Sequence, residues 1–130
     1  MKIELDSNIS GKNKIRAYSN DGLLIGDTLY QSSLILTPEQ IVTDWPPKWF
    51  SDLAAQHFSA VIELDPEIVL LGTGGQLQFP DPDVLSPLVV NNIGFEIMDT
   101  GAACRAYNFL MGEGRKVVAA LLTIETGSAV

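Results

Sequence analysis

The sequence predicts an α/β domain, and the prediction rests on the segment from residue 66 to residue 122. This segment alternates short apolar runs with longer amphipathic stretches, the patterns of buried strands and of surface helices. Ile68–Leu71 is entirely apolar, and Lys116–Leu122 contains six successive apolar residues, so both indicate strands that are covered on both faces. Strand, glycine turn, helix, strand, helix and strand follow in the order expected of an α/β protein.

The chain has 130 residues, which is enough for one domain with a buried core. We expect a single domain over residues 1–130, with a β-meander portion at 1–47 and an α/β portion at 51–122. Turn residues separate the short apolar runs of the first portion, and Pro46 and Pro47 end it because proline cannot donate to a strand ladder. The expected strands are Lys14–Tyr18, Leu23–Ile25, Thr28–Tyr30, Ser33–Leu36 and Ile41–Thr43.

The α/β portion begins with a predicted helix over Ser51–Leu64, which Ser51 is able to cap. A second helix is predicted to begin at Asp81–Pro82. Pro87 lies inside its apolar stripe (Val84, Leu85, Leu88 and Val89) and should kink the helix or shorten it to begin near Ser86. The remaining expectations are an end to that helix at Gly94, a strand over Phe95–Met98, a helix from Thr100 to about Met111 capped by Asp99, and Lys116–Leu122 as a central strand.

The composition argues against several classes of function. The net charge is −8, from 16 acidic and 8 basic residues, and such a field repels nucleic acids and anionic membranes. The chain has one cysteine, so no disulfide forms within it, and no apolar run reaches the length of a membrane span. The N-terminus shows neither a long apolar region nor the basic character of a transit peptide. We therefore expect a cytoplasmic protein without nucleic-acid partner, direct membrane insertion, metal or cofactor.

The predicted helix over residues 100–112 has two different faces when it is projected at about 100° per residue. The apolar face, which should pack on the sheet, holds Ala103, Tyr107, Leu110 and Met111, with Cys104 at its border. The opposite face holds Gly101, Arg105, Asn108 and Gly112. Small residues beside one arginine allow another backbone or a ligand to approach this face closely.

The loop Gly72–Gly75 follows a buried strand, and the N–H groups of Gly72, Thr73 and Gly74 are candidates to hold an anion. It lacks the Gly-Lys-Ser/Thr ending of a nucleotide loop, so a tight turn that needs a positive φ is favoured. Asp99 is favoured as a helix cap over an anion site at the free N–H groups behind it. Arg105 is the best single binding candidate, although an ion pair with Asp99, Glu96 or Glu113 is favoured over a ligand carboxylate.

Cys104 needs a nearby base to act as a nucleophile, and His57 is the one histidine available. A buried, inert cysteine is favoured over this pairing, and one cysteine with one histidine makes a poor metal site. Phe79–Pro80 and Trp45–Pro47 are apolar loop segments. They either cover the core or form an exposed anchor for a partner.

Several short motifs resemble a widespread domain-of-unknown-function family that includes mitochondrial complex I assembly factor 3 and short uncharacterised bacterial and archaeal proteins. The motifs lie within residues 66–122 and are Leu70–Gly74, Phe79–Pro80, Ile93–Gly94, Met98–Thr100, Ala102–Arg105, Tyr107–Asn108 and Glu113–Arg115. The resemblance implies a three-layer α/β domain with a central mixed five-stranded sheet, in which the last strand is central and antiparallel. It implies no catalytic residues.

Three hypotheses about function follow. The leading one is a small cytoplasmic protein-interaction or assembly factor, which by resemblance is similar to complex I assembly proteins. Its expected partner is an unidentified protein, and it is also compatible with a homo-oligomer. The alternative is a small-molecule or anion-binding protein, or an enzyme, with a crevice between the Gly72–Gly75 loop and the Arg105 helix face. In the third, the Arg105 face only pairs within the protein. The predicted binding or interaction residues are Gly72, Thr73, Gly74, Phe79, Asp99, Arg105 and Asn108.

Overall fold

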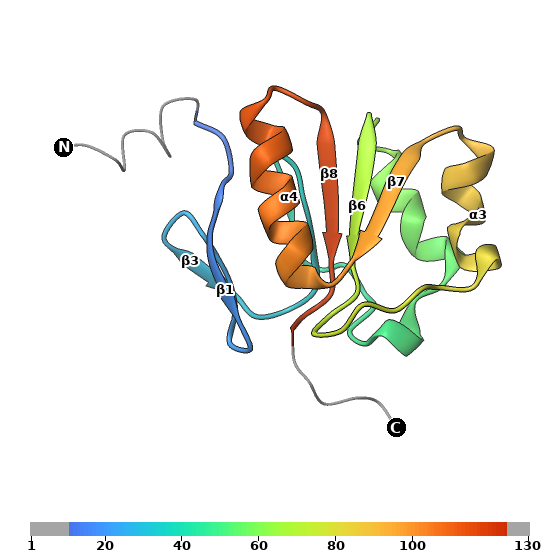
Figure 1. Ribbon diagram of the computed structural model, residues 1–130, viewed down its shortest axis with the longest axis horizontal. Helices are drawn as coiled ribbons and strands as arrows, with labels where there is room; N and C mark the ends of the chain where they lie inside the picture. The colour runs from blue at the N-terminus through green and yellow to red at the C-terminus, as the bar shows by residue number, and fades with distance from the viewer. Residues whose placement is uncertain (1–10, 125–130) are drawn as a thin grey trace.

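A computed structural model describes residues 11–124, so residues 1–10 of the predicted meander portion lie outside the described residues. The strands are β1 (Ile15–Ser19), β2 (Gly22–Ile25), β3 (Thr28–Tyr30), β4 (Leu34–Leu36), β5 (Ile41–Val42), β6 (Ile68–Gly72), β7 (Gly94–Met98) and β8 (Val117–Leu121). They form a five-stranded mixed sheet in the order β5-β4-β8-β6-β7 and a separate three-stranded antiparallel sheet, β1-β2-β3 (Figure 1).

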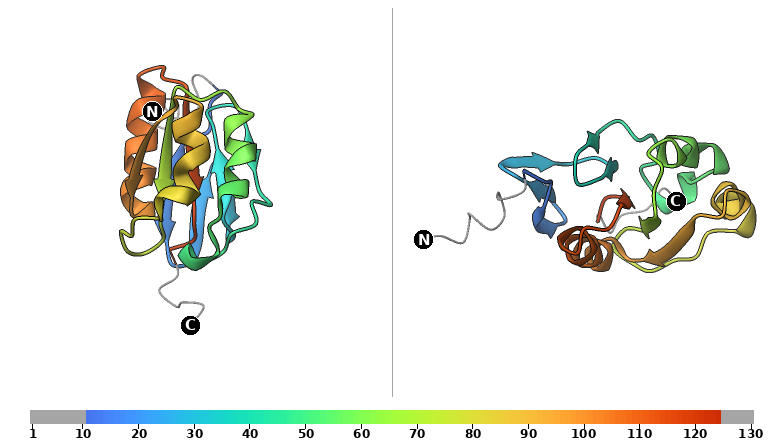
Figure 2. Two further views of the ribbon diagram at one scale, coloured as in Figure 1. Left: turned by 90° about the vertical axis from the view of Figure 1, so that its right-hand side faces the viewer. Right: turned by 90° about the horizontal axis from the view of Figure 1, so that it is seen from above.

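Helices cover both faces of the five-stranded sheet, which confirms the three-layer architecture (Figure 2). They are the 3₁₀ turns η1 (Phe50–Asp52) and η2 (Ala55–Phe58), and the α-helices α2 (Ser59–Ile62), α3 (Pro82–Val90) and α4 (Thr100–Gly112). Helix α4 packs on one face together with the small sheet. Side chains of η2, α2 and α3 pack on the other face.

The two faces explain the apolar runs in the sequence, because successive side chains of a strand point to opposite sides. Residues such as Leu70, Ala119 and Leu121 pack towards α4, while their neighbours Val69, Ala120 and Leu122 pack towards α2 and α3. All five residues of β8 are buried. The fully apolar strands are therefore the ones covered on both faces, as the sequence predicts.

The meander predicted in the first third forms all its strands, but it is divided between the two sheets. Strands β1, β2 and β3 pair only with one another among the described residues, whereas β4 pairs with β8 and carries β5 at the edge of the main sheet. Burial accounts for the division. All three residues of β4 are buried, as in a strand covered on both faces, but only Ile15 of β1 is.

The last strand lies in the centre of the sheet, as expected, and it is antiparallel to only one of its two neighbours. It runs antiparallel to β4 and parallel to β6, with Val118 beside Val69. The connections explain this orientation. Helices α3 and α4 carry the chain back along the sheet between β6 and β7 and between β7 and β8, so these three strands run in one direction.

The predicted helix over Ser51–Leu64 is wrong, because the segment is broken into η1, η2 and the short helix α2. Leu53 and Ala54 are extended between the two 3₁₀ turns. Side chains hold this shape: the Asp52 carboxylate accepts a hydrogen bond from the Trp49 N–H at 3.0 Å, and His57 Nδ1 accepts one from the Ala54 N–H at 3.0 Å. The first turn thus begins after Trp49, without the expected cap at Ser51.

Helix α3 begins at Pro82, as predicted, and includes Pro87, so of the two alternatives the shortened helix beginning near Ser86 is wrong. Proline cannot donate to the carbonyl four residues earlier, which is that of Asp83. The Ser86 hydroxyl donates to this carbonyl instead, at 2.9 Å. The helix ends before Asn92, whose φ is +57°, rather than at Gly94, which is the first residue of β7.

Thr100, the first residue of α4, ties that helix to two strand ends. Its side chain is fully buried, and its hydroxyl donates to the Leu122 carbonyl and accepts from the Gly74 N–H, both at 2.8 Å. Gly72 permits this approach, since a Cβ at that position would lie 2.8 Å from Thr100 Oγ1 and 2.9 Å from Thr100 Cα. The start of α4 is therefore fixed against the C-terminal ends of β6 and β8.

Thr100→Val keeps the shape of the side chain and removes both hydrogen bonds. We expect it to lower the free energy of unfolding by about 1–3 kcal/mol, because a buried N–H and a buried C=O lose their partner. Urea denaturation measures the change. Thr123→Val is the matched control: its hydroxyl is buried without a hydrogen-bond partner, so its removal should cost nothing. Equal losses in the two variants would contradict this role of Thr100.

Gly72→Ala tests the close approach of β6 and α4. The added methyl group would meet the backbone of Thr100, and we expect a loss of about 1–3 kcal/mol in the free energy of unfolding. Gly94→Ala is the control on the neighbouring strand, because the nearest atom to its new Cβ is the Glu67 carbonyl oxygen at 3.9 Å. Thermal unfolding of both variants should show a lower melting temperature for Gly72→Ala alone.

Candidate functional site

The glycine loop after β6 is a buried turn. Gly74 has φ +100°, which confirms the need for a positive φ. Gly72, Thr73 and Gly74 are all buried, and the N–H groups of the last two donate to the Met98 carbonyl and to Thr100 Oγ1. The Thr73 hydroxyl donates to the Gln76 carbonyl at 2.6 Å. The fold therefore already uses the donors that an anion would need from Thr73 and Gly74.

Asp99 caps helix α4, as the sequence predicts. Its carboxylate oxygen Oδ1 accepts a hydrogen bond from the Ala102 N–H at 2.8 Å. The carboxylate adds negative charge at the helix N-terminus, where it is favourable to the helix dipole. The same charge opposes a ligand anion at this position.

Arg105 contacts an aromatic side chain rather than any of the three carboxylates considered as partners. Its guanidinium donates to the Tyr18 hydroxyl and lies 6.0 Å from the centre of that ring. Gly101 allows the ring to sit against α4, since a Cβ there would lie 2.8 Å from Tyr18 Cε1. The expected ion pair with Asp99, Glu96 or Glu113 is not among the contacts of residues 11–124, in which Tyr18 of β1 lies over this helix face.

Asn108 binds the backbone of β1. Its side-chain amide accepts from the Ile15 N–H at 3.0 Å and donates to the Ile15 carbonyl at 2.8 Å. One residue earlier, the Tyr107 hydroxyl donates to the Asn13 carbonyl at 2.6 Å. The helix face of small residues thus receives another backbone, one of the two alternatives predicted for it, and that backbone belongs to the same chain.

Three of the predicted residues do come together around a surface hollow of about 270 Å³. Gly74, Asp99 and Arg105 line it, with Tyr18 and Gly75. The hollow holds one guanidinium and one carboxylate, so its charge favours neither anions nor cations. Gly72, Thr73, Phe79 and Asn108 are not in its lining.

Cys104 is buried in the core beneath α4, which confirms the prediction of a buried free cysteine. Burial raises the pKa of its thiol to about 12, although the charge of Arg105 opposes the shift. His57 is on the other side of the sheet, where its ring meets Trp45 edge to face at 6.5 Å. Within the described range no group of three or more metal-binding side chains comes together.

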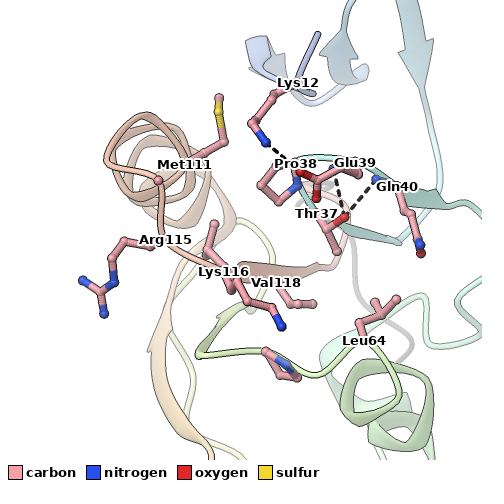
Figure 3. A pocket seen from close by; sticks show the side chains of 13 residues that line it. Lys12, Thr37, Pro38, Glu39, Gln40, Leu64, Met111, Arg115, Lys116 and Val118 are labelled. Carbon is pink, nitrogen blue, oxygen red and sulfur yellow. Dashed lines mark hydrogen bonds and ion pairs between the residues drawn. The ribbon is translucent and has the colours of Figure 1, made fainter. Parts of the chain in front are cut away.

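A second pocket, which the sequence did not indicate, has a volume of about 290 Å³ at the start of β8 (Figure 3). Its charged lining residues are Lys12, Glu39, Arg115 and Lys116. The Lys12 amine is 2.7 Å from the Glu39 carboxylate, while Arg115 and Lys116 pair with Glu67 and Asp65. Figure 3 shows the Arg115 side chain directed away from the pocket. No local motif could predict it, since its residues come from separate segments.

Of the two apolar loop segments, Trp45–Pro47 and Phe79–Pro80, the first places its aromatic side chain in the core and the second exposes it. Trp45 is 4% exposed and covers the core, and its indole N–H donates to the His57 carbonyl at 2.9 Å. Phe79 is 70% exposed, which is the outcome expected of an anchor for a partner.

Exposed apolar residues that the sequence did not predict lie in the loop after β6 and at the end of α3. Leu77, Val89 and Val90 are exposed, the last to 77%, so assigning Val89 to the buried stripe of α3 is wrong. Leu85 and Leu88 fill the buried face of this helix, and the next two residues turn away from it. The run Leu88, Val89 and Val90 was the available signal, since three successive helical residues span about 200°, which is wider than the buried stripe of a surface helix.

The comparisons with known proteins are consistent with this fold. The chain is 33% identical over 117 residues, 88% of its length, to a cattle protein named NADH dehydrogenase [ubiquinone] 1 alpha subcomplex assembly factor 3. It spans 63% of that relative. A crystal structure of a Bordetella parapertussis protein is 35% identical with a TM-score of 0.80, covering 86% of this chain and 96% of the other.

One relative has a name that mentions a membrane. A Francisella tularensis protein called 13 kDa major membrane protein is 27% identical over 90 residues, 68% of this chain and 72% of the relative. Across residues 11–124, this chain has no helix with the length and apolar character needed to cross a membrane. The model of a family described as protein of unknown function (DUF498/DUF598) matches residues 15–122, and the chain belongs to that family.

Proposed function

We propose that this protein binds a partner protein during the assembly of a respiratory NADH dehydrogenase complex and performs no reaction itself. The observation that carries the proposal is the similarity to the relative named as an assembly factor, which extends over most of this chain. The proposal retains the cytoplasmic location that the sequence predicts. In this role the protein would cover an apolar surface of its partner until assembly is complete.

The local chemistry supports binding more than catalysis. The thiol is buried with a raised pKa, and the N–H groups of Thr73 and Gly74 donate hydrogen bonds within the fold. The hollow beside Arg105 has charges of both signs. By contrast, Leu77, Phe79, Val89 and Val90 expose large apolar side chains, which are typical of protein contacts.

Deletion of the gene in its host tests the role in assembly. We expect less fully assembled NADH dehydrogenase complex on native gels and a matching loss of NADH-dependent quinone reduction, because a partner subunit lacks its binding protein. Succinate dehydrogenase activity is the internal control and should not change. Wild-type protein supplied in trans should restore the complex.

An unchanged amount of assembled complex after deletion would contradict the proposed role. So would recovery of the complex without any co-purification of its subunits on the tagged wild-type protein. The co-purification measurement separates direct binding of a subunit from an indirect effect of the deletion on the growth of the host.

The buried thiol also predicts a loss of stability in alkali. The pKa of Cys104 rises from 9.0 to about 12 on folding. The unfolded chain therefore loses the thiol proton first, so the free energy of unfolding is at its full value below pH 9 and declines as the pH rises towards 12. At pH 10.5 the loss is about 2 kcal/mol relative to pH 7, at about 1.4 kcal/mol per pH unit. Urea unfolding at both pH values should show a smaller decline for Cys104→Ala. An equal decline in the variant would refute the shift.

A further inference from the structure

Strand β7 is an open edge of the five-stranded sheet. It follows β6 at the end of the strand order, and within residues 11–124 no strand pairs with its outer side. The other edge strand, β5, has only two residues, so β7 offers the longer template. An unpaired edge of this kind is a site where an extended segment can add as a further strand.

The hydrogen bonds to β6 show which backbone groups face outwards. The Met98 carbonyl accepts from the Thr73 N–H at 2.9 Å, so the polar groups of Met98 point to β6. Backbone groups alternate between the two sides of a strand, and those of Phe95 and Ile97 therefore point away from the sheet. Their side chains remain partly buried against the core beneath α3, so this edge is held in place.

Exposed apolar side chains lie near both ends of this edge. Val89 and Val90 are the last residues of α3, shortly before β7 begins. The connection to the strand is fixed by a hydrogen bond from the Ile93 N–H to the Leu88 carbonyl. The loop that carries Leu77 and Phe79 passes the C-terminal end of β7 (Figure 1). A segment laid along β7 would therefore reach an apolar contact at each end.

The charged side chains of α3 and β7 are all acidic, and the nearest ion pair, between Arg115 and Glu67, lies at the start of β7. Residues 49–104 contain eight acidic side chains and no lysine or arginine. Asp81 and Asp83 at the start of α3 and Glu96 in β7 are exposed. A second copy of the chain would bring the same acidic edge and a further net charge of −8, and like charges across an interface are unfavourable.

We infer that the outer edge of β7 binds an extended segment of a partner protein that is rich in lysine or arginine and has an apolar side chain near each end. This inference rests on the proposed function and identifies the chemistry of the partner. The segment forms a sixth strand through the backbone groups of Phe95 and Ile97. Its apolar ends contact Val90 and Phe79, and its basic side chains face Glu96 and Asp83. The five residues of β7 set the paired length.

Selection from a randomised nine-residue peptide library displayed on phage tests the preference for sequence. We expect the peptides bound by the wild-type protein to be enriched in lysine and arginine, with apolar residues towards their ends. Failure to enrich any peptide, or enrichment of acidic peptides, overturns the inference. A concentration-dependent dimer in sedimentation that protects β7 without any peptide also overturns it, because a second copy is then the occupant.

Amide hydrogen exchange with the best selected peptide locates the binding site. In the free protein the Phe95 and Ile97 amides should exchange faster than the Glu96 and Met98 amides, and the peptide should slow the first pair. Exchange of Phe95 and Ile97 that the peptide leaves unchanged rejects strand addition at this edge.

Matched variants test the contacts. The double variant Phe79→Ser and Val90→Ser, and separately Glu96→Lys, should each weaken peptide binding about tenfold or more, as expected when anchor residues are lost. The controls are Phe109→Ser, on α4 and 67% exposed, and Glu113→Lys at the end of α4. Both controls should keep wild-type affinity. Equal effects of test and control variants overturn the inference.

The two proposals fail in different ways. If gene deletion lowers the assembled NADH dehydrogenase complex but no peptide binds at β7, the assembly role stands and the edge is not its binding site. If basic peptides bind at β7 and deletion leaves the complex unchanged, the edge binds a basic segment of a protein with another role.

Discussion

The hydroxyl group of Thr100 fixes helix α4 against the main sheet, and the rest of the structure depends on this attachment. It joins the start of α4 to the loop after β6 and to the residue after β8, through hydrogen bonds to Gly74 and Leu122. These bonds are buried, where leaving either partner unsatisfied is costly. The position of α4 then fixes Arg105 and Asn108, and through them β1 and the small sheet are attached to the main body.

This arrangement explains why the most recognisable motifs of the chain are structural. Thr73 and Gly74 use their N–H groups to close the turn, Asp99 caps the helix, and Gly101 and Asn108 receive β1. The local sequence permits each of them either to support the fold or to hold a ligand. Hydrogen bonds and close packing within the chain occupy the groups that a ligand would use. The surface left for partners is elsewhere.

The charge distribution complements this division. The lysines and arginines of the described range lie before residue 49 or after residue 104, while Asp81 and Asp83 at the start of α3 and Glu96 in β7 are exposed. Exposed apolar side chains occur in the same region. An acidic and apolar surface beside an open strand edge suits the capture of a basic partner segment, whose approach the long-range field favours.

The sequence by itself determined the α/β class, the five short N-terminal strands, the capped helix α4 and the central buried strand β8. Each follows from local periodicity, a cap or an uninterrupted apolar run. Only the tertiary structure decided that β4 leaves the meander for the main sheet, that Ser51–Leu64 breaks into short turns, and that Arg105 meets Tyr18. The first and last outcomes depend on segments distant in sequence, because β4 pairs with β8 and β1 lies across α4. The broken segment is held by side-chain bonds to the backbone within the segment and just before it, at Ala54 and Trp49, and the apolar periodicity that predicted a helix does not report such bonds.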